Sequence, residues 1–129
     1  MYKMNKKIIT LLNITLLIGT FYLWEKSRID GIAGDLLGIL LKTDTKYSDG
    51  YTDIGFKKIK NGMSEKEVIE TLGEPLVRWK PYKKTKYKEK EHYVCFQYSE
   101  SPNSTNYRLR QVHLENKIVV KVIAEFYLD

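Results

Sequence analysis

The apolar segment near the N-terminus constrains this chain more than any other feature. Residues 8–24 carry no charge, whereas Lys3, Lys6 and Lys7 precede the segment and charge returns at Glu25. As a helix the segment would extend about 25 Å. This length is slightly shorter than a bilayer core of about 30 Å, but it still meets the lower limit for a helix that crosses a membrane. The pattern predicts a basic cytoplasmic region over residues 1–7 and a transmembrane helix over residues 8–24.

The residues that end the apolar segment favour a signal anchor that is not cleaved. Cleavage by a signal peptidase needs small residues at this place, but the chain has Phe21, Tyr22, Leu23 and Trp24. We expect a single-pass protein of the inner (cytoplasmic) membrane with an extracytoplasmic C-terminal part, because the lysine-bearing end stays in the cytoplasm. The alternative is a buried helix of a soluble domain.

Residues 25–50 are predicted to connect this anchor to the domain. The run from Ile32 to Leu41 is apolar, is interrupted by Gly34, Asp35 and Gly38, and is too short to cross a membrane. It is interpreted as an interfacial helix or a strap against the domain, and a helix packed on the core is equally compatible with its length. The polar residues 42–50 place the start of the domain at residue 51.

Residues 52–75 carry local signals for two short helices joined by a tight turn. Phe56, Ile59 and Met63 share one helical face, and Thr52 or Asp53 can cap this first helix. Ser64 begins the second helix and forms a capping box with Glu67. A left-handed turn should end the first helix, an apolar contact onto Val68 should fix the start of the second helix, and a glycine followed by a proline should end it. The residues that we expect to determine this part of the fold are Gly62, Met63, Ser64, Glu67, Gly73 and Pro75.

The rest of the chain is predicted to be antiparallel β structure. Residues 118–127 alternate with a period of two, and a turn at residues 115–117 pairs them with residues 107–114, where a bulge or an edge position fits the weaker alternation. Residues 92–99 form a third strand and residues 76–82 a fourth, with a loop over residues 100–106. The expected fold class is α+β, with an N-terminal membrane anchor helix before a two-helix hairpin packed on a three- to four-stranded antiparallel sheet.

The segment FKKIKNGMSEKEVIETLGEP, residues 56–75, resembles the opening of the BamE-like (SmpA/OmlA) domain of the bacterial cell envelope. The resemblance covers about residues 51–129. It implies a fold like that of the β-lactamase inhibitor protein, and a role in binding other proteins rather than in catalysis, including accessory work in outer-membrane β-barrel assembly. Lipoproteins of this family carry a cysteine directly after the signal, whereas the single cysteine here is Cys95, so N-terminal lipidation is not expected.

A stretch rich in lysine and aromatic residues is the candidate binding surface. Residues 79–90 hold six lysines and one glutamate, a local charge of +5, within a chain whose net charge is +6. Lysines can contact phosphates while aromatic rings stack or insert, and outside the cytoplasm the polyanions would be anionic lipids or wall polymers rather than nucleic acid. The alternative is a solvated loop whose lysines protect an edge strand. The candidate residues are Trp79, Lys80, Tyr82, Lys83, Lys84, Lys86, Tyr87 and Lys88.

The composition offers little for catalysis, and no cofactor or metal site is expected. One cysteine excludes an intramolecular disulfide, and His92 lies three residues from Cys95 in a strand, so the two side chains point to opposite faces. His113 could approach Cys95 across the sheet, but without an orienting third group a buried structural thiol is the better interpretation. The favoured function is a membrane-tethered module that binds an envelope protein. A polyanion-binding module is the second hypothesis and a small hydrolase using Cys95 is the third.

Overall fold

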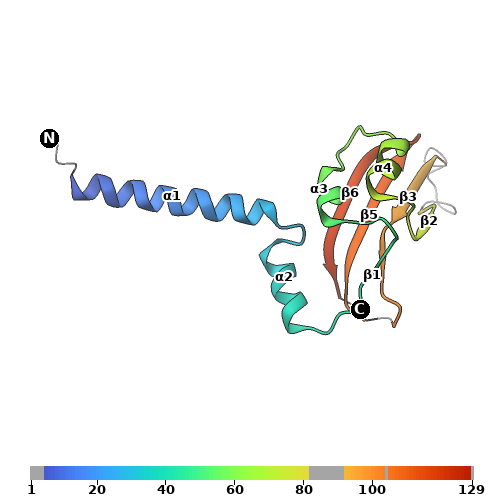
Figure 1. Cartoon of the computed structure of the whole chain (residues 1–129), viewed down its shortest axis with the longest axis horizontal. Coiled ribbons are helices and arrows are strands. Elements are labelled where there is room, and N and C mark those ends of the chain that lie inside the picture. The colour runs from blue at the N-terminus through green and yellow to red at the C-terminus, as the bar shows by residue number, and fades with distance from the viewer. Residues whose placement is uncertain (1–4, 82–91, 104, 129) are drawn as a thin grey trace.

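A computed structural model describes residues 5–81, 92–103 and 105–128 of the chain. In these residues the protein is α+β, with helices α1 to α4 and two antiparallel sheets, the larger with strand order β2-β3-β5-β6. Figure 1 shows α1 extending away from the rest of the molecule, while α3 and α4 lie over the larger sheet. The predicted class, an apolar N-terminal helix before a helix pair and an antiparallel sheet, is confirmed at this level.

Helix α1 (Lys6–Ser27) contains the apolar segment that the sequence identifies. Its part Lys6–Trp24 is long and apolar enough to cross a membrane, and none of that part is buried against the rest of the chain. In water, a helix is stabilised mainly by packing its apolar side against the rest of the protein, and this part of α1 has no such packing. Helix α1 can therefore act as a membrane span or a signal anchor.

The helix pair consists of α3 (Asp53–Lys58) and α4 (Glu65–Leu72). The Thr52 hydroxyl oxygen accepts a hydrogen bond from the Gly55 N–H at 3.0 Å and so caps α3. In α4 the Ser64 hydroxyl accepts from the Glu67 N–H, and the Glu67 carboxylate accepts from the Ser64 N–H at 2.7 Å. The predicted cap of α3 and the predicted capping box of α4 are both confirmed.

The turn between these helices differs from the prediction. Helix α3 ends at Lys58, and Ile59 is already extended, so Gly62 does not end a helix and Met63 lies beyond it. Gly62 has a φ of 93°, whereas Asn61 stays at negative φ. The Gly62 N–H donates to a carbonyl of the last strand, that of Val119, at 2.8 Å. The left-handed glycine therefore turns the chain against the sheet.

The end of α4 is as predicted. Gly73 has a φ of 74°, and its N–H donates to the Ile69 carbonyl at 2.8 Å. Pro75 follows two residues later, where a helix cannot continue. The apolar side of the helix, Val68 and Leu72, is fully buried.

Four strands form the larger sheet: β2 (Val77–Trp79), β3 (Tyr93–Gln97), β5 (Tyr107–Glu115) and β6 (Ile118–Tyr127). Each pairs antiparallel with its neighbour. Asn116 and Lys117 connect β5 to β6 with φ of 50° and 65°, as a two-residue hairpin turn of type I′ requires. The predicted hairpin is confirmed.

Strand β6 does not keep the strict period of two that its sequence indicates. Leu114 lies opposite Val119, whereas the preceding His113 lies opposite Lys121, so Val120 is the extra residue of a β-bulge. The prediction that the alternate residues from Ile118 onward share one face is therefore wrong before the bulge, because a bulge shifts the alternation by one. The β6 residues packed against the core are Val119, Val122 and Ala124.

A smaller sheet joins β1 (Lys46–Tyr47) to β4 (Ser99–Glu100). The strand predicted over residues 92–99 is therefore two strands, β3 and β4. Tyr98 separates them: its N–H donates to Arg110 on β5, and its carbonyl accepts from the Ser48 N–H. The hydrogen bond from Ser48 to Tyr98 joins the residues before position 51 to the body of the domain.

The hydrophobic core lies between the helix pair and one face of the larger sheet. Helix α4 supplies its buried stripe from one side, and alternate residues of β3, β5 and β6 supply the other. The buried core residues are Phe56, Ile59, Val68, Leu72, Phe96, Tyr98, Val112, Leu114 and Val119.

A buried ion cluster ties the predicted connector to this core. Asp30, just before α2 (Gly31–Leu40), binds Arg110 of β5 at 2.6 and 2.8 Å and also pairs with Arg108. The side chains of Asp30 and Arg110 are 2% and 1% exposed. Burial disfavours the charge of Arg110, but its hydrogen bonds to Asp30 hold its pKa above the ordinary value. Residues before position 51 therefore complete the fold.

The capping box yields a direct test of the helix pair. Ser64→Ala removes the oxygen that accepts from the Glu67 N–H, so the free energy of unfolding should fall by about 1 kcal/mol. Urea unfolding of the full chain in a mild detergent measures this loss. Lys60→Ala, an exposed change in the same loop, is the control and should stay within about 0.5 kcal/mol. Equal effects of the two changes would contradict the role of the cap.

Candidate functional site

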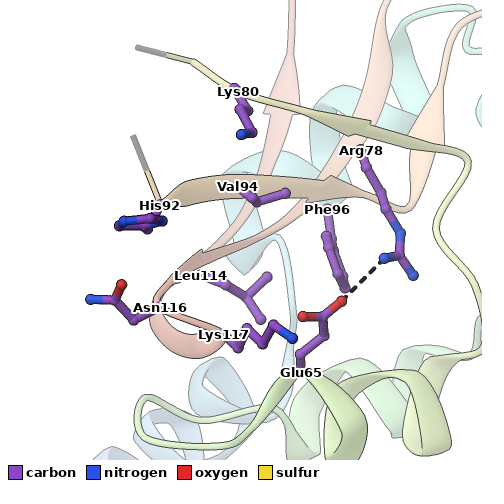
Figure 2. Close-up of a pocket in the computed structure, with 9 residues that line it drawn as sticks. All are labelled: Glu65, Arg78, Lys80, His92, Val94, Phe96, Leu114, Asn116 and Lys117. Atoms are coloured by element: carbon purple, nitrogen blue, oxygen red, sulfur yellow. Dashed lines mark hydrogen bonds and ion pairs between the residues drawn. The ribbon is translucent and has the colours of Figure 1, made fainter. Parts of the chain in front are cut away.

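The candidate site is a pocket of about 500 Å³ beside the start of α4. Strands β2 and β3, the first residue of α4 and the β5–β6 turn all contribute to its walls (Figure 2). The antiparallel register brings these segments together, because Val94 of β3 lies directly opposite Leu114 of β5. The lining residues are Glu65, Arg78, Lys80, His92, Val94, Phe96, Leu114, Asn116 and Lys117.

The floor of the pocket is apolar. Val94, Phe96 and Leu114 are inward-facing residues of the sheet that line the pocket; Val94 is partly buried, whereas Phe96 and Leu114 are 1% and 2% exposed. The Arg78 guanidinium lies over the Phe96 ring, with its central carbon 4.6 Å from the ring centroid. The pocket therefore offers an apolar surface with a cation stacked at one side.

The rim of the pocket carries more positive than negative charge. Arg78 is neutralised by ion pairs with Glu65 at 3.1 Å and Glu74 at 2.6 Å. Among the residues that the structure describes, Lys80 and Lys117 have no ion-pair partner. Figure 2 shows these two lysines on opposite sides of the pocket, with the apolar floor between them. The arrangement suits a ligand with an apolar part and a negative charge.

The predicted lysine and aromatic surface is only partly within the described residues. Lys80 lines the 500 Å³ pocket, whereas Trp79 does not. Trp79 and Lys80 together border an adjacent hollow of about 360 Å³. The remaining predicted residues, Tyr82, Lys83, Lys84, Lys86, Tyr87 and Lys88, lie outside the described residues.

Sequence reasoning missed most of the pocket lining. The sequence predicts that Val94 and Leu114 lie in strands and that Lys117 lies in a turn. No local pattern indicates that these three residues come together around one pocket. The signal that could have found them is the hairpin register, since the turn at Asn116 brings Lys117 next to the end of β5. Arg78 and Glu65, 13 residues apart in sequence, are likewise brought together only by the fold.

On the opposite face of the sheet, Cys95 and His113 lie directly across from each other. The Cys95 Sγ is 3.5 Å from the His113 Nε2, and the Gln111 Oε1 is 3.1 Å from the same nitrogen. Burial raises the pKa of the Cys95 thiol to about 12 and lowers the pKa of His113. A buried thiol with a raised pKa is a poor nucleophile, so the pair suits a structural role.

The described residues contain no group of three or more His, Cys, Asp or Glu side chains that could hold a metal ion. Comparisons with family models, with curated proteins and with solved structures find no match to this chain.

Proposed function

We propose that this protein is a membrane-tethered module of the cell envelope that binds a segment of a partner protein in the pocket beside α4. The observation that carries the proposal is the apolar floor between Lys80 and Lys117, two lysines with no ion-pair partner in the part of the chain that the structure describes (Figure 2). Apolar contacts supply affinity for a side chain of the partner, and the lysines select a segment that carries a carboxylate. The partner is therefore an acidic segment with at least one large apolar side chain.

A binding role is favoured over a catalytic one by the chemistry of the lining. The Glu65 carboxylate in the lining is engaged in an ion pair with Arg78 at 3.1 Å. Cys95 lies on the far face of the sheet, away from the pocket. The resemblance of residues 56–75 to BamE-like domains also supports protein binding, since the helix pair and following sheet have the order that the resemblance implies. An accessory role in envelope or outer-membrane assembly is the particular form of this proposal.

The tether in this proposal is α1, which would span the inner membrane and leave the α+β domain outside the cytoplasm. Membranes washed in alkaline carbonate should keep the protein, and its intact mass should include the first 25 residues or so, because no small residues follow the apolar segment. Release into the wash, or a mass that lacks this segment, would contradict the anchor.

The pocket is tested by peptide selection with the full chain in nanodiscs. Peptides enriched from a random library should combine Asp or Glu with a large apolar residue. Changing Lys80→Glu and Lys117→Glu together should weaken their binding about tenfold, since an exposed charge contact contributes about 0.5 to 1 kcal/mol. The matched control is Lys58→Glu with Lys60→Glu, two exposed lysines that do not line the pocket. A library that yields no such peptides, or peptides that bind both variants equally, would contradict the proposal.

Binding of anionic surfaces is the second candidate function, because Lys80 at the start of the lysine stretch is exposed and unpaired among the described residues. Replacing Lys83, Lys84, Lys86 and Lys88 by Gln should change stability little but reduce binding to anionic vesicles by about three orders of magnitude, at about 1 kcal/mol per lysine. Flotation of the full chain in neutral nanodiscs with anionic vesicles measures this. The control replaces four exposed lysines elsewhere, Lys58, Lys60, Lys66 and Lys121. Wild-type protein that ignores anionic vesicles at low salt would eliminate this candidate.

A further inference from the structure

Helix α2 presents its apolar side chains to the outside of the molecule. Leu36, Ile39 and Leu40 are 53%, 81% and 68% exposed. Their spacing of three and four residues places them in one stripe along the helix. A surface helix of a soluble domain does the reverse, turning its apolar stripe to the core and its polar side to water.

The side of α2 that faces the domain is small and polar. Gly34 is buried, and a Cβ added there would lie 3.6 Å from the Phe126 Cβ of β6. Gly38 lies against Arg108, where an added Cβ would be 2.6 Å from a guanidinium nitrogen. Asp35 accepts a hydrogen bond from Arg108 at 3.0 Å. These contacts fix which side of α2 faces the sheet, so the stripe is held outward.

The outward stripe lies where a membrane crossed by α1 would have its surface. Figure 1 shows α2 beginning close to the end of α1, running across the direction of α1, and lying between α1 and the sheet. The Arg28 guanidinium joins the two helices, because it lies 3.9 Å from the Trp24 ring centroid and forms an ion pair with Asp35. A helix that runs across a membrane span at its end lies in the plane of the interface.

We propose that α2 lies in the interface of the membrane that α1 crosses, with Leu36, Ile39 and Leu40 at the boundary of headgroups and acyl chains. The inverted amphipathic pattern requires an apolar neighbour, and the adjoining helix supplies the bilayer as that neighbour. This proposal rests on the membrane anchor of the proposed function but not on the pocket.

The consequence is a fixed orientation of the domain. Helix α2 contacts Arg108 and Phe126, at the end of the β5–β6 hairpin away from its turn, whereas the pocket includes Leu114 and Lys117 at the turn. The pocket therefore lies at the end of the β5–β6 hairpin farther from α2, and so away from the helix that contacts the membrane surface in this proposal.

Fluorescent labels on the full chain in nanodiscs test this placement. Ile39→Cys and Leu36→Cys are made in a Cys95→Ala background, with Lys66→Cys on α4 as the exposed control and Leu12→Cys as the reporter of α1. We expect lipids brominated near the headgroup to reduce the emission of the Ile39 and Leu36 labels at least twofold. Aqueous iodide should quench these two labels at least twofold less than the Lys66 label.

The outcomes separate the anchor from the interfacial helix. If brominated lipid quenches the Leu12 label but the Ile39 and Leu36 labels behave like the Lys66 label, the proposal for α2 is overturned. The proposal that α1 is a membrane anchor then still stands. Absence of lipid quenching at all positions overturns both. Protection of the Ile39 label from iodide without quenching by brominated lipid shows a second copy or another protein on the stripe, which also overturns the proposal.

Discussion

Replacing Asp30 by alanine should destabilise the fold by about 3 to 5 kcal/mol, because it leaves a buried guanidinium without its carboxylate. Both terminal nitrogens of Arg110 bind Asp30, at 2.6 and 2.8 Å, and the Arg110 side chain is 1% exposed. In the variant the guanidinium would keep the Tyr51 hydroxyl and the Leu109 carbonyl, neither of which carries a compensating charge. Urea unfolding of the full chain in a mild detergent measures the loss.

Two comparisons make this result specific to the buried cluster. Glu100→Ala removes the exposed pair with Lys46, at 3.1 Å, and should cost less than about 1 kcal/mol. Asp30→Leu combined with Arg110→Met removes both charges and should recover most of the stability lost by Asp30→Ala. If Asp30→Ala costs no more than Glu100→Ala, the cluster does not hold the segment before residue 51 to the sheet.

Local chemistry predicted the elements whose signals lie within a few residues of each other. The capping box of Ser64 and Glu67 needs only the first turn of α4, and Gly73 ends that helix through its own φ. The turn at Asn116 is equally local, because positive φ in two successive residues is what a type I′ hairpin needs. Such signals act through backbone groups that are close in sequence, so they can be read without knowing the fold.

Features that depend on distant residues could not be predicted in this way. Asp30 and Arg110 are 80 residues apart, and an arginine within an apolar strand gives no indication of which carboxylate will meet it. The sequence of residues 107–114 fits a bulge or an edge position, but β5 lies between β3 and β6, and the extra residue of the bulge, Val120, lies on β6 instead. The pocket is missed for the same reason, since the register of β3 with β5 creates its floor.

Helix α2 shows a different limit of sequence analysis. Its apolar run is equally compatible with an interfacial helix and with a helix packed on the core, because both placements would bury the same Leu and Ile residues. The structure adds which side faces the sheet, and that side is the glycine side with Gly34 and Gly38. Glycines within an apolar helix can thus mark the contact face, leaving the larger side chains for another apolar environment.

Gly73→Val should be about as damaging as the loss of Asp30, with an expected cost of about 4 kcal/mol. The φ of 74° strains a β-branched residue by about 1 to 3 kcal/mol, and forced overpacking adds a similar amount. An added Cβ would lie 2.7 Å from the Asp49 carbonyl oxygen, which is backbone and cannot rotate away as a side chain can. The Gly73 carbonyl also accepts a hydrogen bond from the Tyr98 hydroxyl at 3.2 Å, so a shift there would disturb the core.

Gly62→Val separates the two causes of this loss. Gly62 also has positive φ, at 93°, but an added Cβ there would meet no heavy atom within 4 Å. Its cost should therefore be the backbone strain alone, about 1 to 3 kcal/mol, and the difference between the two valine variants measures the clash with Asp49. Urea unfolding of both variants gives this difference. Equal losses would mean that the segment around Asp49 yields to the new side chain, and that the end of α4 is not locked against the residues that precede α3.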